Sequence, residues 1–483
     1  MYSSIASGLT PITDPYRFIA IPLGDRLTWT GRWGPFPGDR GCVQPKRFNI
    51  VEISFYREEN LILQPAAHMD DRIIALETRD VRFPLPAGAG SDAVHSGSDY
   101  AFATSLLMTE GKKFGTGIVL TLGNGNQLVC RAIEMLAREV IGREVEELMS
   151  NFGEISRQLA NDPQLRWLGP HKGVVHLALA SVTNACFDLW AKLRGVPLWR
   201  LLLDLNPQQL VNLLDLSYLE DVLTSADALS ILENQMSGRA ARERIMQQGY
   251  PGYDTSVGWF QYGDDKVKSL AQQALQRGFR AFKLKVGSEE GSRDLRRAFM
   301  LRELAGSDAI IMLDANQQWT LPTAVRICRE LAAMKPYFVE EPTHPDDIAA
   351  HKKLADAIAP TRIALGEHVP NRVMFKNMMQ AGAVHFVQVD CTRVAGISEF
   401  ITVSLLARKF GLPVVPHVGD MGQIHQHLVL FNHVALGHDA LFLECIPHLQ
   451  EHFVAPAKVQ NGVYLTPSLP GSSSDLRGVR PGH

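Results

Sequence analysis

The sequence predicts an α/β fold: a (β/α)8, TIM-like barrel that follows a smaller N-terminal α+β domain. The barrel is predicted from short apolar runs that recur at an even spacing and that each end in an ionisable residue. These ionisable residues are Lys285, Asp314, Glu340, Glu367, Asp390, His417 and Glu444. The steps between them are roughly 23 to 29 residues, which is the length of one strand and one helix in such a barrel.

The first 68 residues stand apart from the rest of the sequence. They mix Pro, Gly, Arg and Trp without a helical period, and residues 49–63 could form a strand or two. We therefore interpret residues 1–68 as an appended extension that is poorly ordered.

Residues 69–197 predict the α+β domain. Strands are expected near Ile73, Ala103 and Ile118, and helices over residues 128–140 and 173–193. Residues 87–100 are rich in Gly and Ser and predict a surface loop between two of the strands.

Residues 198–447 predict the barrel. Connecting helices are expected up to about residue 249, and residues 253–259 have the composition of the first barrel strand. The later apolar runs are short and continuous, as in strands buried on both faces, and helical periodicity fills the segments between them. Between Asp314 and Glu340, apolar residues repeat at intervals of three and four at Ala324, Ile327, Cys328 and Leu331. Residues 448–483 are expected to return to the α+β domain and to end in a frayed, Ser/Gly/Arg-rich tail.

Composition narrows the class of protein. The chain has 483 residues, of which 46% are hydrophobic and 20% charged, as in a globular enzyme with more than one core. A formal net charge of -3 and the lack of a basic cluster argue against a nucleic-acid partner. The six cysteines show no paired spacing, and neither a signal peptide nor a long uninterrupted apolar run is evident, so we expect reduced thiols, a cytoplasmic location and no membrane partner.

Three of the strand-end residues predict a metal site. Asp314, Glu340 and Glu367 end adjacent strands, and the active site of a barrel is built at that rim. Each carboxylate alone also fits an ordinary role, such as capping the next helix, but three of them together would repel each other unless a hard cation lay between them. An all-oxygen donor set completed by water and substrate oxygens favours Mg²⁺.

Two further strand ends supply candidate acids and bases on either side of this metal. Lys285 would need a lowered pKa to act as a base, and the like charge of Lys283 on the same strand face is expected to lower it. His417 needs a partner that sets its tautomer, and Asp390 on the preceding strand is the candidate. A Lys or His base beside Mg²⁺ is suited to removing a proton α to a carboxylate and stabilising the ene-diolate that results.

The same residues carry a resemblance. The motifs are Lys283-Leu284-Lys285, Asp314-Ala315-Asn316, Val339-Glu340-Glu341-Pro342, Gly366-Glu367 and Pro416-His417. Together they resemble the signature of the mandelate racemase branch of the enolase superfamily. From about residue 70 to about residue 471 the chain is most similar to the sugar-acid dehydratases of the L-fuconate type, through stretches at residues 164–170, 184–192, 371–376 and 451–453.

The resemblance implies a role for each site residue. Asp314, Glu340 and Glu367 would bind Mg²⁺, Lys285 would remove the C2 proton of a sugar acid, and His417 would protonate the departing 3-hydroxyl, which yields a 2-keto-3-deoxy acid. Glu444 would hydrogen-bond the substrate carboxylate, with Asn316 as a further contact. The α+β domain would cap the barrel mouth, and its loop would act as a lid that brings Asp92 and Tyr100 to the substrate. A homo-oligomer is also expected.

Two loops depart from the family pattern and leave the substrate open. His368-Val369-Pro370 stands where those dehydratases have Met-Cys-Gln, and residues 418–427 replace a Gly-rich run that contains an acidic residue. A racemase or epimerase of a 2-hydroxy acid would use the same Lys and His as two bases, and a catalytically inactive binding protein could use the same fold. A zinc amidohydrolase would need a His-x-His motif at the first strand, whereas His425-Gln426-His427 follows the seventh.

Overall fold

The computed structural model describes residues 19–23, 26–30, 69–96 and 99–482. The chain divides into two compact units, residues 1–66 and residues 67–483. In the first unit, β1 (Ile19–Leu23) and β2 (Arg26–Thr30) form an antiparallel pair. The strand expected within residues 49–63, and most of the extension expected over residues 1–68, lie outside the described residues.

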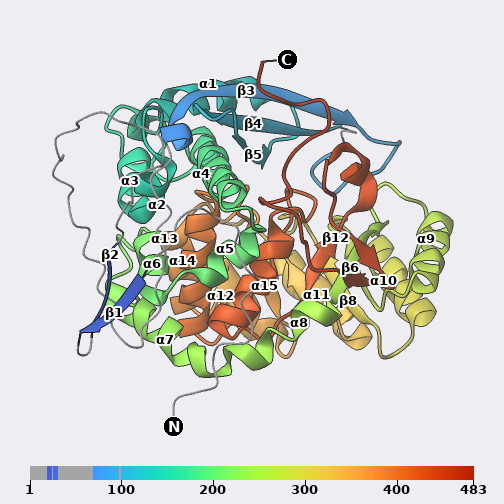
Figure 1. The fold of residues 1–483 in the computed structure, drawn as a ribbon. Helices are drawn as coiled ribbons and strands as arrows, with labels where there is room; N and C mark the ends of the chain where they lie inside the picture. Colours follow the sequence, from blue (N-terminus) through green and yellow to red (C-terminus); the bar gives the residue numbers. More distant parts are fainter. Residues whose placement is uncertain (1–18, 24–25, 31–68, 97–98, 483) are drawn as a thin grey trace, which may run out of the picture. The chain divides into compact units, whose positions relative to one another are not determined.

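The second unit begins with a three-stranded antiparallel sheet in the order β3-β4-β5. Its strands are β3 (Ile73–Pro84), β4 (Asp99–Thr109) and β5 (Phe114–Leu120), and its helices are α1 (Asn126–Leu136), α2 (Val145–Ser150), α3 (Phe152–Ala160) and α4 (Gly173–Leu193). The strands expected near Ile73, Ala103 and Ile118 and the helix expected over residues 173–193 are therefore confirmed. Figure 1 shows this sheet with α1 and α4 beside it.

Helix α4 packs closely on β5 because β5 carries glycine where the two elements approach. A Cβ atom at Gly117 would lie 1.8 Å from the Ser181 carbonyl oxygen, and one at Gly115 would lie 2.3 Å from that of Ala185. By length and composition alone α4 could cross a membrane, contrary to our expectation that no segment would, but 89% of its most apolar window is buried inside the protein. Helix α4 therefore has the burial of a helix in a protein core.

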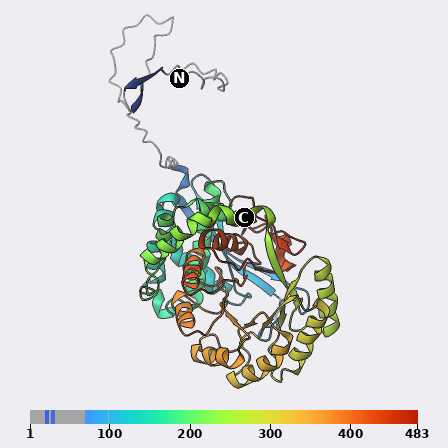
Figure 2. The ribbon, with the colours of Figure 1, turned by 90° about the horizontal axis from the view of Figure 1, so that it is seen from below.

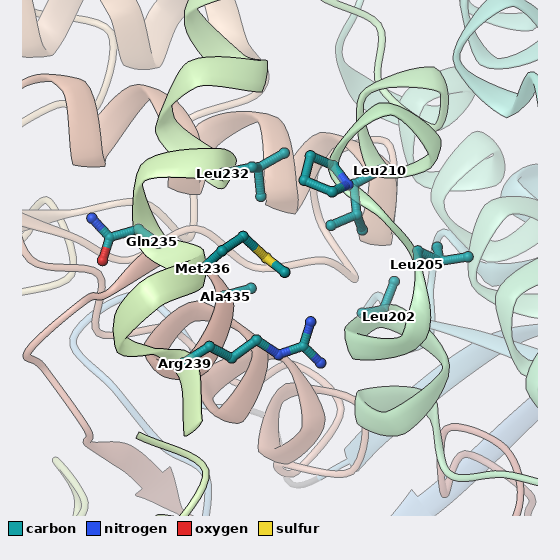
Figure 3. A pocket seen from close by; sticks show the side chains of 9 residues that line it. Leu202, Leu205, Leu210, Leu232, Gln235, Met236, Arg239 and Ala435 are labelled. Carbon is teal, nitrogen blue, oxygen red and sulfur yellow. The ribbon is translucent and has the colours of Figure 1, made fainter. Parts of the chain in front are cut away.

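Four helices follow: α5 (Leu198–Asp204), α6 (Pro207–Asn212), α7 (Ser225–Arg242) and α8 (Ile245–Gln248). Leu202, Leu205, Leu210, Leu232 and Met236 of this group surround a small apolar hollow, with Ala435 on one side (Figure 3). Arg239 lies at its edge, where its Nε donates to Glu243 at 3.0 Å. None of the predicted site residues lines this hollow.

The barrel strands are parallel, and the first six of them pair in sequence order. They are β6 (Tyr250–Gly258), β7 (Ala281–Lys285), β8 (Ile310–Asp314), β9 (Val339–Glu340), β10 (Ile363–Leu365), β11 (Phe386–Val387) and β12 (Leu443–Cys445). Val414 adds a single bridge to Val387, and β12 pairs back with β6 and returns the sheet to its first strand. The predicted (β/α)8-type architecture is confirmed.

Helices cover the outside of the strands. They are α9 (Asp264–Gln276), α10 (Ser292–Ala305), α11 (Leu321–Leu331), α12 (Ile348–Ile358), α13 (Arg372–Gln380), α14 (Ile397–Lys409) and α15 (His425–Leu436). Figure 2 shows α9 to α12, yellow to orange, in an arc around the strands. The four periodic residues of α11 are all buried, as predicted. Inside the ring, a layer of side chains fills the barrel floor: Tyr253, Ala281, Met312, Phe338, Ala364, Phe386, Val415 and Phe442.

Short elements complete the unit. They are 3-10 helices over Met69–Asp71, Ala137–Glu139, Leu165–Leu168, Ala332–Met334 and Pro447–His452, and the strands β13 (Val459–Gln460) and β14 (Val463–Tyr464). Strand β14 runs antiparallel to β6. The five cysteines among the described residues are buried and free.

The expectation of a frayed C-terminal tail is wrong for residues 471–475. The Ser472 amide donates to Asp188 at 2.7 Å, and Lys192 of α4 donates to Asp475 at 2.7 Å. Ser472 and Ser474 are fully buried. The polar composition that predicted fraying instead satisfies buried polar groups of α4 and β5.

Candidate active site

The strand ends bring the predicted residues together. The pairing register places Lys285 of β7 opposite Asp314 of β8, and Asp314 opposite Glu340 of β9. Glu367 and Asp390 follow the ends of β10 and β11, and both loops turn toward the same centre, since Glu367 and Asp390 each contact His417. Glu444 lies within β12 and closes the ring beside β6.

Asp314, Glu340 and Glu367 form a carboxylate cluster, in which one oxygen of each lies within 4.8 Å of the others. Burial, and after it the neighbouring charge of Asp314, raise the pKa of Glu340 to about 8. A buried, all-oxygen donor set of this kind fits a hard divalent cation such as Mg²⁺. The three residues predicted as metal ligands are therefore placed where they could share one ion.

The two lysines of β7 face this cluster, but their electrostatics differ from our expectation. Lys283 Nζ lies 3.1 Å from Glu340 Oε2 and 2.9 Å from Glu444 Oε1, so its charge is neutralised locally. Lys285 Nζ lies 2.5 Å from Asp314 Oδ2. Burial is the largest single effect and lowers the pKa of Lys285, but the carboxylates around Lys285, Asp314 foremost, together outweigh burial and Lys283 and raise the pKa above its usual value. Lys283 lowers the pKa of Lys285 as expected, but the net lowering that we expected is wrong for the protein's own charges. A cation that engaged Asp314 would remove one cause of the rise.

His417 lies on the other side of the cluster, between two carboxylates. Its Nδ1 donates to Asp390 Oδ2 at 2.7 Å, and its Nε2 lies 2.9 Å from Glu367 Oε2. Burial lowers the pKa of His417, but Glu367 and Asp390 together raise it well above the usual value. The bond to Asp390 leaves Nε2 as the nitrogen that can exchange a proton at the cluster.

A cavity opens over these groups, and residues of the α+β domain form part of its wall. Lys285, Glu367, His417 and Glu444 line it from the barrel. Asp92 and Tyr100, the two predicted contacts from the other domain, also line it. Asp314, Glu340, Lys283 and Asp390 lie behind this wall rather than in it.

Asn316 does not line the cavity. Its amide N–H donates to Asp314 Oδ1 at 3.0 Å, its side chain is 2% exposed, and its Oδ1 has no hydrogen-bond partner among the described residues. Asn316 therefore does not face the cavity, and its contact with a substrate stays a prediction.

Several cavity residues were not predicted from the sequence: His95, His368, Arg393, Leu120, Leu122, Trp259 and Ile446. His95 Nδ1 donates to Asp92 Oδ2 at 2.9 Å, and His368 Nδ1 lies 3.0 Å from Glu341 Oε1. Burial lowers the pKa of His368, but Glu341 and Glu367 together outweigh it and raise the pKa to about 10. The position of His368 directly after Glu367 was a usable signal, whereas Leu120 ends β5 and the others come from loops that only the fold brings to the barrel mouth.

Comparisons with known proteins agree with this geometry. Residues 266–478 match the family described as Enolase C-terminal domain-like. The chain is 42% identical over 416 residues to human Mitochondrial enolase superfamily member 1, covering 84% of this chain and 94% of that protein. The crystal structure of that human protein superposes with a TM-score of 0.82, covering 85% of this chain and 95% of that one.

Two dehydratases are also similar. L-galactonate dehydratase of Hypocrea jecorina is 41% identical over 414 residues, covering 84% of this chain and 92% of that protein. L-talarate dehydratase from Polaromonas sp. JS666, solved with Mg and L-glucarate, is 24% identical with a TM-score of 0.64 and covers 84% of this chain and 95% of that one. At that identity the second likeness concerns the fold alone.

Proposed function

We propose that this chain, which belongs to the mandelate racemase branch of the enolase superfamily and is a hydro-lyase of that superfamily, dehydrates an aldonic acid of the L-fuconate type. One observation carries the proposal: Lys285 and His417 line one cavity from opposite sides of a carboxylate cluster. This arrangement supports a base and an acid that act on two faces of the same substrate. The similarity to a protein named L-galactonate dehydratase supports an aldonic acid as the substrate class.

The cofactor is Mg²⁺, which Asp314, Glu340 and Glu367 would hold. When bound there it supplies Lewis-acid stabilisation of the negative charge that develops on the substrate carboxylate.

The reaction is an elimination of water. Lys285 Nζ takes the proton from C2 to give an ene-diolate, and the electron pair of the ene-diolate then forms a double bond between C2 and C3 as the C3–O bond breaks. His417 Nε2 gives its proton to the leaving hydroxyl, so that water departs. The enol that remains becomes the 2-keto-3-deoxy acid by proton transfer to C3.

The other cavity residues orient the substrate. Glu444 is held by Lys283 Nζ and by the Thr255 hydroxyl, which donates to Glu444 Oε1 at 2.5 Å, and its Oε2 has no hydrogen-bond partner among the described residues. This free oxygen is suited to accept a hydrogen bond from the substrate. Burial raises the pKa of Tyr100, so its hydroxyl stays protonated and can donate. Asp92 is held by His95 and can accept from a sugar hydroxyl.

The domain division at residues 197 and 447 is part of the proposal. Residues from both sides of the first boundary line the same cavity, which supports the role of residues 69–197 as a cap over residues 198–447. A cytoplasmic location and assembly into a symmetric oligomer stay predictions.

The test is a substrate screen with Mg²⁺ against five- and six-carbon aldonic acids, in which the 2-keto product is measured. We expect keto acid from L-fuconate or from an acid of related stereochemistry. Protein with Lys285→Ala, purified in the same way, controls for contaminating enzymes. Inversion at C2 without keto product would show a racemase or epimerase on the same residues and would overturn the dehydratase assignment.

A further inference from the structure

A second histidine and carboxylate lie behind the dyad of His417 and Asp390. His425 is the first residue of α15, Asp420 lies in the loop before it, and both are fully buried. Neither lines the cavity. They belong to the segment of residues 418–427 that departs from the family pattern.

Asp420 fixes the imidazole of His425. Asp420 Oδ1 accepts a hydrogen bond from His425 Nδ1 at 2.7 Å, and Asp420 Oδ2 accepts from the main-chain amides of Ile424 at 2.5 Å and His425 at 3.1 Å. The ring of His425 also packs edge to face on Phe400, with centroids 5.7 Å apart. Asp420 and Phe400 therefore restrain the imidazole of His425 from two sides.

The free nitrogen of this imidazole faces the segment that carries Asp390. His425 Nε2 accepts from the main-chain amide of Cys391 at 3.1 Å and lies 3.3 Å from Asp390 Oδ1. Neutral His425 holds the Cys391 amide, and protonated His425 would hold the Asp390 carboxylate. In either protonation state, Nε2 restrains residues 390–391.

Asp390 passes this restraint to His417. Its Oδ1 accepts from the amide and hydroxyl of Thr392, both at 2.7 Å, and its Oδ2 accepts from His417 Nδ1 at 2.7 Å and from the Gly419 amide at 2.8 Å. We propose that Asp420 and His425 are positioning residues that, through residues 390–391, aim His417 Nε2 at the leaving hydroxyl. This inference rests on the proposed dehydratase function.

A metal site built from Asp390, Cys391 and His425 explains the cluster less well. Asp420 already occupies His425 Nδ1, and the Cys391 amide occupies Nε2. Burial raises the pKa of the Cys391 thiol well above its usual value, so the thiolate that a metal needs is disfavoured.

Two amide variants separate the two nitrogens of His425. In His425→Asn, the amide reaches the position of Nδ1 and can still meet Asp420, but nothing replaces Nε2. In His425→Gln, the amide reaches the position of Nε2 and can meet the Cys391 amide or Asp390. His427→Asn is the matched control, because His427 is buried on the same helix and contacts the Trp199 amide and Ser473 instead.

The readout is the ratio of C2 hydrogen exchange with deuterated solvent, which requires Lys285, to formation of 2-keto acid, which also requires His417. We expect His425→Asn to lower keto-acid formation about 10-fold, since a misplacement of about 1 Å can cost about 10²-fold, and to leave exchange and KM nearly unchanged. His425→Gln should stay within about threefold of the wild type, and His427→Asn should keep the wild-type ratio. Asp420→Asn, which keeps the side-chain shape at the start of α15, should change the ratio in the same direction as His425→Asn, by about threefold.

The proposal is overturned if His425→Asn and Asp420→Asn keep the wild-type ratio, or if exchange and keto-acid formation fall in equal proportion, as a loss of folded protein would cause. If His425→Asn does not fold, Asp420→Asn decides the question by the same ratio. Wild-type protein that forms no keto acid from any aldonic acid would refute the proposed function itself, which is a different outcome from an unchanged ratio in the variants.

Discussion

Replacement of His417 by Asn is expected to separate the two halves of the proposed reaction. The Asn amide can occupy the position of Nδ1 and keep the bond to Asp390 Oδ2, which spans 2.7 Å in the wild type. It has no counterpart of Nε2, the nitrogen that lies beside Glu367 in the cluster. The variant therefore removes the proton donor while it preserves the contact that holds the loop.

The size of the effect follows from the two roles. Loss of a positioned general acid slows a reaction by about 10² to 10⁴, which corresponds to about 3 to 5 kcal/mol of barrier. Removal of the C2 proton depends on Lys285 and on the carboxylate cluster, so exchange of the C2 hydrogen is expected to stay within about threefold of the wild type.

The assay follows deuterium incorporation at C2 and release of 2-keto-3-deoxy acid in the same reaction. Lys285→Ala should lose both signals. Asp390→Asn should lose keto-acid formation by about 10- to 100-fold, because an amide has one accepting oxygen for the four donors that Asp390 satisfies, and each buried donor left unpaired costs about 1 to 3 kcal/mol.

Two results would refute this reasoning. Exchange that persists in Lys285→Ala would mean that the base lies on the other face of the substrate. Keto-acid formation at the wild-type rate in His417→Asn would mean that another group protonates the leaving hydroxyl.

Three further predictions concern the metal, the N-terminus and stability. Asp314→Asn should abolish turnover without unfolding the protein, and EDTA should inhibit the wild type until Mg²⁺ is restored; full activity in chelator would contradict a metal role. A chain that starts at Met69 should keep the activity of the full chain, since residues 1–68 show no apolar helical period, and loss of folding on truncation would show that they are integral. Glu399→Gln should lower the free energy of unfolding by about 3 kcal/mol in denaturant titrations at pH 7, because buried Glu399 pairs with His176 at 2.8 Å and Arg372 at 3.3 Å. These partners outweigh burial and lower the pKa of Glu399, so its contribution is present above the unfolded pKa of about 4.3 and is lost as pH falls below that value; a variant as acid-sensitive as the wild type would contradict this.

Much of the barrel and of its catalytic centre could be predicted from the sequence. A strand that is buried on both faces appears in the sequence as a short apolar run. A parallel barrel brings the C-terminal ends of all these strands to one rim. The spacing from Lys285 to Glu444 was therefore enough to predict that these side chains converge, and the structure places them around one cluster. The buried positions of α11 could likewise be predicted, because the side chains on one face of a helix recur every 3.6 residues.

The tertiary structure alone decided which side chains meet across long separations in the chain. Periodicity carries no information on how a loop docks, so it could not show that His95 and Leu122 reach the cavity or that Ser472 is buried against Asp188. Charge balance is equally a property of the folded site. Lys283 lowers the pKa of Lys285 as expected, but Asp314 lies directly against Lys285 and, with the other carboxylates of the site, reverses the net shift. The sequence by itself determined which residues stand at the rim, and packing determined their neighbours and hence their protonation, because electrostatic interactions depend on distances that only the fold sets.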